Sequence, residues 1–413
     1  MKLTKIGALA AVGVLAFSAC TTGPGGGATP PADALGVITI PPGEPVKIAY
    51  WGVLSGADAS LGTDGLTGAQ VALDDKGGTF MEHALQLAPV EDGLCTVDGG
   101  AAAAQKMAAD TTIVALVGSS CSDETVGGIK SLSDAGLTTI SGSATRPALT
   151  APDRTADYAG FLRTAHSDAF QGKALAEFVF NELSLTKAAT LHDGSAYAEA
   201  LQQVFADEFI ALGGEIVIQE QVGRDTTDMT PVLTRVAGAS PEVVYYPIFV
   251  AAGGFVTAQA GDVPGLEDAV LIGSDGMFTP DFVTAAGPAA EGMYLSSPNF
   301  SAFQAGYADF LPKYEAKAGS APISAFHAHA YDAFNIVYAA LEKVTIKAPD
   351  GTLFIPKKAL RDAIYATSGH QGLTGVLSCS PSGDCGAPLI ALYQITEAEI
   401  GGTWPPAAPV WPE

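Results

Sequence analysis

The sequence predicts an α/β protein made of two doubly wound, parallel-sheet lobes. From residue 46 onward, short runs rich in β-branched and aromatic residues alternate with longer segments whose apolar residues recur at helical spacing. The alternation restarts after Arg163, and the 413 residues are enough for about two or three domains. Repeated strand–helix alternation is typical of parallel sheets covered by helices on both faces. Two such series therefore indicate two lobes.

The individual elements follow from this periodicity. In the first series we expect strands at 46–56, 85–93, 113–119 and 137–145, and helices at 62–78, 98–112 and 122–136. In the second series we expect helices at 172–187 and 198–214, and strands at 188–197, 215–222, 243–249 and 269–275. Paired glycines at 77–78 and 213–214 are stop signals for two of these helices.

The N-terminus indicates export. Two lysines precede the apolar run 6–17, and small residues follow it, which is typical of a secretory signal peptide over residues 1–19. The run is too short for a spanning helix, which needs about 20 residues. "LAFSAC" is similar to the lipobox of bacterial lipoproteins, so we expect acylation of Cys20, with ordinary secretion and a free Cys20 as the alternative. The Gly- and Pro-rich segment 20–45 is expected to be a flexible to semi-extended tether.

The charge balance excludes some partners. The chain has 44 Asp and Glu against 20 Lys and Arg, a formal net charge of −24. Nucleic-acid binding needs clustered Lys and Arg, so no nucleic-acid partner is expected.

The four remaining cysteines predict two disulfides, because exported proteins keep such bonds. Cys379 and Cys385 bracket the turn sequence "SPSGD", which leaves Cys95 and Cys121 to pair across a longer loop. Zinc is the alternative, but the CxxC spacing and histidine partners that it usually needs are missing. No metal is expected.

Hydroxyl side chains stand where a ligand carboxylate would bind. In open parallel sheets, ligands bind beyond the carboxyl ends of the strands, where helix N-termini favour anions. Ser122, Ser143 and Thr145 follow two expected strands. Helix capping and turn formation explain each of them taken alone, and their recurrence favours a ligand site.

An acid and several aromatic residues complete the candidate site. Asp275 follows an apolar strand and could accept from an ammonium group, or be merely solvated. Tyr197, Phe249 and Phe326 could form an apolar pocket, or belong to the core. "GSSCS" lacks the G-x-S-x-G pattern, and no P-loop, HExxH or dinucleotide fingerprint occurs, so neither an enzyme nor a cofactor is expected.

Several stretches resemble one family. "KIAYWGVLSGADASLGTDGLTGAQVALDDKGG" resembles the start of the leucine/isoleucine/valine-binding proteins, the solute receptors of ABC importers. "LCTVDGGAAAAQKMAADTTIVALVGSSCSDETV" continues the resemblance, with both cysteines placed where the family has a disulfide. "ISGSATRPALT", "FLRTAHSDAFQG", "LHDGSAYAEAL", "VVYYPIF" and "GSDGMF" follow in the family's order. The resemblance covers nearly all of residues 46–398.

This resemblance implies a type I periplasmic-binding fold, with two lobes joined by a three-strand hinge and a ligand held in the cleft. Lobe 1 would comprise 46–165 and 296–388, and lobe 2 would comprise 166–295 and 389–413. Matching the family's motifs assigns the ligand carboxylate to Ser122, Ser143 and Thr145, the ammonium to Asp275 (a Glu in the best-known members), a covering role to Tyr197, and the side-chain pocket to Leu61, Phe249 and Phe326.

We therefore expect an extracytoplasmic lipoprotein that is held at the membrane by its lipid. The resemblance implies that it captures a small amino acid, aliphatic or branched-chain, and delivers it as a monomer to ABC permease subunits. Domain closure around the ligand would be the mechanism. Two alternatives stay open: the same fold binding an amide, urea or an aromatic acid, and a ligand sensor without a transport role.

Overall fold

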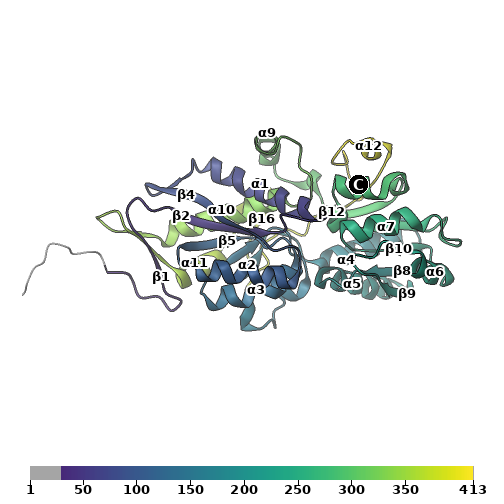
Figure 1. The fold of residues 1–413 in the computed structure, drawn as a ribbon, viewed down its shortest axis with the longest axis horizontal. Coiled ribbons are helices and arrows are strands. Elements are labelled where there is room, and N and C mark those ends of the chain that lie inside the picture. Colours follow the sequence, from purple (N-terminus) through teal and green to yellow (C-terminus); the bar gives the residue numbers. More distant parts are fainter. Residues whose placement is uncertain (1–28, 413) are drawn as a thin grey trace, which may run out of the picture.

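The computed structural model describes residues 29–412, which form two lobes side by side along the long axis of the molecule (Figure 1). The expected signal peptide and Cys20 lie outside the described residues. Within residues 29–412, no helix combines the length and the apolar character needed to cross a membrane. Each lobe contains one six-stranded sheet. The predicted fold class, α/β with two parallel-sheet lobes, is confirmed.

The first lobe has a six-stranded sheet with helices on both faces. Its strands are β2 (Val46–Gly52), β3 (Thr79–Phe80), β4 (His83–Asp92), β5 (Ile113–Val117), β6 (Thr139–Ser141) and β7 (Phe161–Arg163), and its helices are α1 (Ala59–Asp75), α2 (Val97–Ala109), α3 (Ser122–Asp134), α9 (Gly306–Ala318), α10 (His327–Val344) and α11 (Lys357–Tyr365). The strand order is β3-β4-β2-β5-β6-β7, and only the β3–β4 pair is antiparallel. One core packs the sheet against α1, α10 and α11, and another packs it against α2 and α3.

The second lobe repeats this design. Its strands are β8 (Lys187–His192), β9 (Glu215–Gln221), β10 (Val243–Tyr245), β11 (Val270–Gly273), β12 (Tyr294–Pro298) and β17 (Ile390–Gln394), and its helices are α4 (Asp168–Glu177), α5 (Ala196–Leu212), α6 (Thr230–Gly238), α7 (Val250–Ala260), α8 (Pro280–Ala286) and α12 (Glu397–Ile400). The order is β17-β12-β11-β10-β8-β9, and only the β12–β17 pair is antiparallel.

The chain passes between the two sheets three times. It crosses from β7 to α4, from β12 to α9, and from the short hairpin of β15 (His370–Gln371) and β16 (Val376–Leu377) to β17. β12 pairs with β17 as far as Pro298, so the expected lobe boundary between 295 and 296 falls inside this strand. The second crossover therefore starts three residues later than the resemblance implied.

Residues 37–40 form a strand, which corrects part of the expected tether. β1 (Val37–Ile40) pairs antiparallel with β14 (Leu353–Pro356), and the other edge of β14 holds β13 (Ile346–Lys347). Ile38 and Ile40 alternate into the first lobe's core and are each 3% exposed. Burial of two alternating isoleucines outweighs the helix- and strand-breaking composition around them. The chain is therefore fixed to the first lobe well before residue 45.

Arg163 ends β7 as a fully buried cation. Its guanidinium donates to the Asp384 carboxylate, to the Thr150 hydroxyl, and to the carbonyl oxygens of Ala144 and Arg146. A buried charge is tolerated when an opposite charge and hydrogen bonds satisfy it. These bonds tie the first crossover to the segment that precedes the third.

Both expected disulfides are present. Cys95 bonds Cys121 at a sequence separation of 26, and Cys379 bonds Cys385 at a separation of 6. The first bond is buried directly before α3, whereas the second staples the loop that carries Asp384. The first therefore fixes the loop between β5 and α3.

Replacing both Cys95 and Cys121 by serine is expected to lower the free energy of unfolding by about 3.5 kcal/mol, the loop-entropy value for its loop length. The Cys379–Cys385 disulfide closes a much shorter loop, so replacing both of these cysteines by serine is expected to lower the free energy of unfolding by only about 2 kcal/mol. Urea denaturation of the two double variants measures the difference, and equal losses would contradict it.

Candidate functional site

The loops at the carboxyl ends of the two sheets meet at a small cavity between the lobes. The free space in this cavity is only about 10 Å³, which is room for about one water molecule. The lobes are thus closed over it, and a solute larger than water enters only when they separate. Its lining comes from both lobes: Leu61, Ser120, Cys121, Ser122 and Ser143 from the first, and Tyr197, Phe249, Asp275 and Gly276 from the second. Six of the eight predicted site residues are brought together here.

The start of α3 bounds the cavity on the first lobe. The first-turn N–H groups of a helix lack intrahelical partners and favour an anion. Ser122 Oγ accepts from Arg146 N at 3.2 Å, so the hydroxyl proton of Ser122 remains available to a ligand. Ser143 Oγ instead donates to Ser120 O at 2.9 Å. Ser122 is therefore the better donor to a carboxylate, and Ser143 mainly holds the loop.

Glu124 fixes the loop that presents Ser122. Its carboxylate accepts from the backbone N–H groups of Cys95 (3.0 Å), Ser120 (2.8 Å) and Cys121 (3.1 Å). Burial raises the pKa of Glu124 to about 7, although these three bonds favour the ionised form. The disulfide and this carboxylate together hold the strand end and the helix start in one geometry.

Asp275 is the acid on the opposite wall. Its Oδ1 accepts from Gln171 Nε2 at 2.6 Å and from Tyr197 OH at 2.9 Å. Burial raises the pKa of Asp275 to about 6, and these hydrogen bonds oppose the shift. Because both bonds use Oδ1, Oδ2 is left for a ligand cation.

Aromatic rings cover the cavity, but two predicted site residues lie elsewhere. The Tyr197 and Phe249 rings are 5.3 Å apart and form the wall contributed by the second lobe. Phe326 is 1% exposed and stacks on His166 at 5.9 Å, away from the cavity lining. Thr145 is buried as well, and its hydroxyl has no hydrogen-bond partner within residues 29–412. The roles implied for Phe326 and Thr145 stay predictions.

A buried polar cluster that sequence reasoning missed lies beside Asp275. It comprises His166 and Asp168 of the first crossover together with Gln171 of α4. Burial lowers the pKa of His166 to about 4, so its imidazole is neutral. Burial and the neighbouring Asp275 raise the pKa of Asp168, and the nearby Thr145 hydroxyl and Arg163 oppose that shift. Asp168 begins α4 shortly after β7, which is the same arrangement that singled out Ser122 after β5.

Polar contacts join the two lobes around the cavity mouth. Arg224, in the loop after β9, donates to Cys95 O at 2.7 Å and to Asp58 Oδ2 at 3.1 Å on the first lobe. Its guanidinium also lies 4.7 Å from the centre of the Phe249 ring, which lines the cavity. Asp123 Oδ1 accepts from Ala196 N at 3.0 Å. These bonds form only with the lobes together, so they stabilise the closed form.

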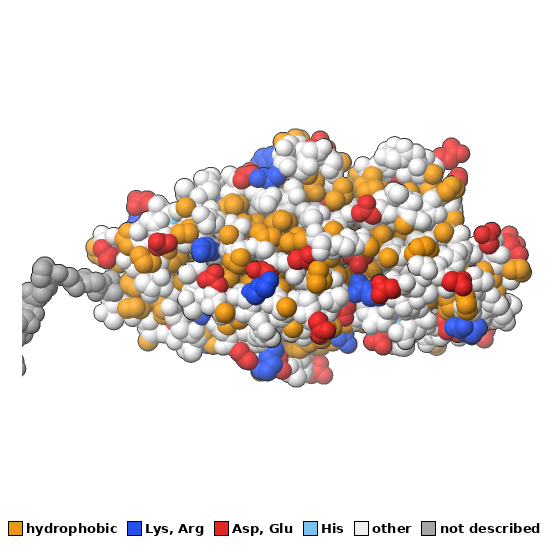
Figure 2. Space-filling model, viewed as in Figure 1, with side chains coloured by type: hydrophobic (Ala, Val, Ile, Leu, Met, Phe, Trp, Pro, Cys, Tyr) orange, Lys and Arg blue, Asp and Glu red, His pale blue; other side chains and the backbone are white. Residues whose placement is uncertain are grey.

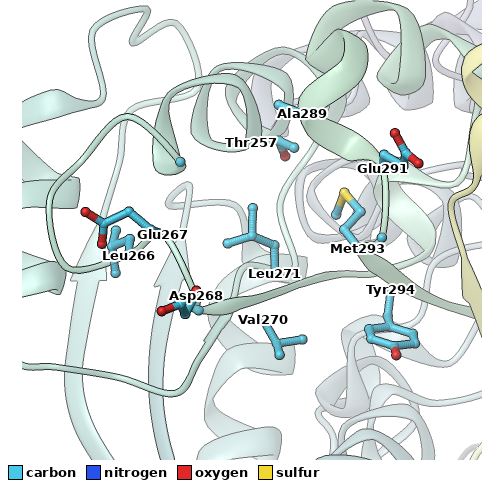
Figure 3. Close-up of a pocket in the computed structure, with 13 residues that line it drawn as sticks. Thr257, Leu266, Glu267, Asp268, Val270, Leu271, Ala289, Glu291, Met293 and Tyr294 are labelled. Atoms are coloured by element: carbon cyan, nitrogen blue, oxygen red, sulfur yellow. The ribbon is translucent and has the colours of Figure 1, made fainter.

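A larger hollow lies at the other end of the second sheet. It surrounds the amino ends of β11 and β12, and Figure 3 shows Glu267, Asp268 and Glu291 at its rim around Leu271 and Met293. Ligands in parallel α/β folds bind at the carboxyl ends of strands, and Glu267 and Asp268 are exposed to solvent. Because the larger hollow lies at the amino ends of the strands, the smaller interlobe cavity at their carboxyl ends is favoured as the functional site.

Basic and acidic side chains are interspersed on the surface. On the face shown in Figure 2, the Lys and Arg side chains are scattered, and Asp and Glu side chains accompany most of them. Several pair locally, such as Lys106 with Glu91 and Arg235 with Glu220. This face therefore offers no basic patch to a phosphate backbone.

Comparisons with known proteins agree with this architecture. Residues 45–378 match the family model described as periplasmic binding protein. The Leu/Ile/Val-binding protein homolog 3 of Brucella melitensis is 25% identical over 271 residues, 66% of this chain and 70% of the relative. The Leu/Ile/Val-binding protein of Escherichia coli K12 is 28% identical over 258 residues, 62% of this chain and 68% of the relative.

Solved structures share the fold. The leucine-binding protein LivK of Thermotoga maritima superposes with a TM-score of 0.74 at 21% identity, covering 85% of this chain and 95% of its own. The branched-chain amino acid transporter protein LivJ of Streptococcus pneumoniae, in complex with isoleucine, gives 0.74 at 24% identity, with 86% and 97% covered. The resemblance inferred from the sequence is confirmed.

Replacing Arg224 by alanine is expected to shift the lobes toward an open form. Loss of its two interlobe hydrogen bonds should change the closed-to-open ratio by roughly five- to thirty-fold, corresponding to about 1–2 kcal/mol. A larger radius of gyration in small-angle X-ray scattering would show this. Arg235→Ala, which removes an ion pair within the second lobe only, is the matched control, and identical scattering from both variants would refute the role.

Proposed function

This chain belongs to the periplasmic binding protein family, and we propose that it captures a small aliphatic amino acid and delivers it to the permease of an ABC importer. Proteins of this family bind solutes outside the cytoplasm and are not enzymes. The chain is accordingly of the substrate-binding type found in branched-chain amino acid importers. The ligand itself and its delivery are the proposal.

The observation that carries the proposal is that groups suited to a negative charge and to a positive charge face each other across one closed cavity. The α3 N-terminus and the Ser122 hydroxyl suit a carboxylate, and Asp275 on the facing wall suits an ammonium. A zwitterion satisfies both ends at once. The apolar surfaces of Leu61, Tyr197 and Phe249 and the narrow space between the lobes favour a short aliphatic side chain.

An aromatic acid is the second candidate, because solute-binding proteins of similar fold from Rhodopseudomonas palustris were solved with benzoate and with 3,4-dihydroxybenzoic acid. Such a ligand lacks an ammonium group. It would leave the buried Asp275 facing the ligand without a positive partner, which is costly in a closed cavity. The amino acid is therefore favoured.

Replacing Asp275 by asparagine is expected to weaken amino-acid binding by at least about a hundred-fold, because the ammonium loses its charged partner in a buried site. Titration calorimetry with leucine, isoleucine, valine and alanine measures the loss, and benzoate and urea are titrated in parallel. Asp268→Asn, which changes an exposed acid at the larger hollow, is the matched control and should bind as the wild type does. Unchanged affinity in Asp275→Asn, or binding of benzoate alone, would contradict the proposed ligand.

A lipid anchor at Cys20 would hold the protein beside its permease. Replacing Cys20 by serine is expected to move the protein from the membrane fraction to the soluble fraction of cells, because no acyl chain can be attached. Immunoblots of fractionated cells, with Cys379→Ser as a control for loss of another cysteine, test this. Equal membrane retention of wild type and Cys20→Ser would refute the anchor.

A further inference from the structure

Three buried side chains from two separate segments converge beside the cavity. One possible ligand atom from each of His166, Asp168 and Asp275 lies within 4.8 Å of the other two. His166 and Asp168 come from the first crossover, and Asp275 follows β11. We propose that this cluster, the hinge triad, binds one divalent transition-metal ion such as Zn²⁺, and this goes beyond the proposed transport of an amino acid.

Gln171 orients the imidazole of His166 as a ligand. The Gln171 amide nitrogen donates to Asp275 Oδ1 at 2.6 Å and to Ser296 Oγ at 2.9 Å, so its oxygen faces His166 Nε2 at 2.6 Å. His166 therefore donates from Nε2 and presents the lone pair of Nδ1, which has no hydrogen-bond partner within residues 29–412. Histidines that bind metals are held in this way, with the second ring nitrogen bonded to an oxygen.

The hinge triad contains more hydrogen-bond acceptor atoms than the described residues supply donors for. Both carboxylate oxygens of Asp168 are buried, and within residues 29–412 the nearby Thr145 hydroxyl is at most their one hydrogen-bond donor. Arg163, a cation that acts on Asp168, already donates to Asp384, Thr150 and two carbonyl oxygens. One dication would supply the positive charge that these buried groups lack.

The position of the triad favours a metal over the ligand's own ammonium. Of its three members, only Asp275 lines the interlobe cavity. A ligand in the cavity therefore meets Asp275, and the unpartnered atoms of His166 and Asp168 lie outside the lining. One imidazole and two carboxylates suit Zn²⁺ or Mn²⁺ better than Ca²⁺ or Mg²⁺, which prefer oxygen ligands alone.

The test is metal stoichiometry and affinity in the tag-free exported chain. Protein stripped with a chelator is titrated with ZnCl₂ and MnCl₂ by calorimetry, and bound metal is counted by elemental mass spectrometry after dialysis. One ion per wild-type chain is expected, with binding weakened at least about ten-fold in His166→Ala and in Asp168→Asn. His370→Ala removes a histidine far along the chain from the triad and should bind metal as the wild type does.

The outcomes separate this inference from the proposed function. Absence of stoichiometric Zn²⁺ and Mn²⁺ in the wild type, or full affinity in both triad variants, would overturn the metal site. Leucine titrations of stripped and metal-loaded protein are run alongside: both ligands need Asp275, so metal loading is expected to weaken leucine binding, and the stripped protein tests the proposed function by itself. A third outcome would also overturn the metal site: the wild type binds no metal, and Asp168→Asn loses leucine binding. That result would assign Asp168 to the ligand's ammonium.

Discussion

The buried guanidinium of Arg163 is the interaction on which the geometry of the cleft most depends. It holds the carbonyl oxygens of Ala144 and Arg146, and the Arg146 N–H in turn donates to Ser122. Its ion pair with Asp384 joins the end of the first sheet to the disulfide-stapled loop. One cation therefore positions the side of the cavity formed by the start of α3, together with part of the hinge. Because its charge is committed there, the acids of the second lobe must find positive charge elsewhere.

The two lobes divide the chemistry of the cavity between them. The first lobe presents donors at the α3 N-terminus, held rigid by the Cys95–Cys121 bond and by Glu124. The second lobe presents Asp275 and the aromatic rings. The proposed zwitterionic ligand would need both halves, so its binding and closure would favour one another. The polar contacts of Arg224 and Asp123 between the lobes add to closure.

The sequence alone predicted those features that depend on residues close together along the chain. Strand–helix alternation predicted both sheets, and the rule that ligands bind at strand ends selected Ser122 and Asp275. Three features required the folded structure. His166 and Asp168 follow the three-residue strand β7, and Ser167 caps α4 there, so the segment resembles ordinary capping. Whether the Phe326 side chain lines the cavity or is buried away from it depends on how α10 packs. β1 was hidden by its Gly- and Pro-rich flanks, since its stability comes from residues more than 300 positions away.

The pairing of β1 with β14 also sets the length of the leash, the part of the expected tether between Cys20 and Val37. With the proposed anchor at Cys20, the segment up to Val37 spans at most about 60 Å when fully extended, against roughly 90 Å if the chain were free up to Val46. The leash ends on the first lobe, at the end of the molecule away from the second lobe (Figure 1). The second lobe can therefore swing about the hinge without pulling on the anchor, and membrane attachment would impose no mechanical load on opening and closing.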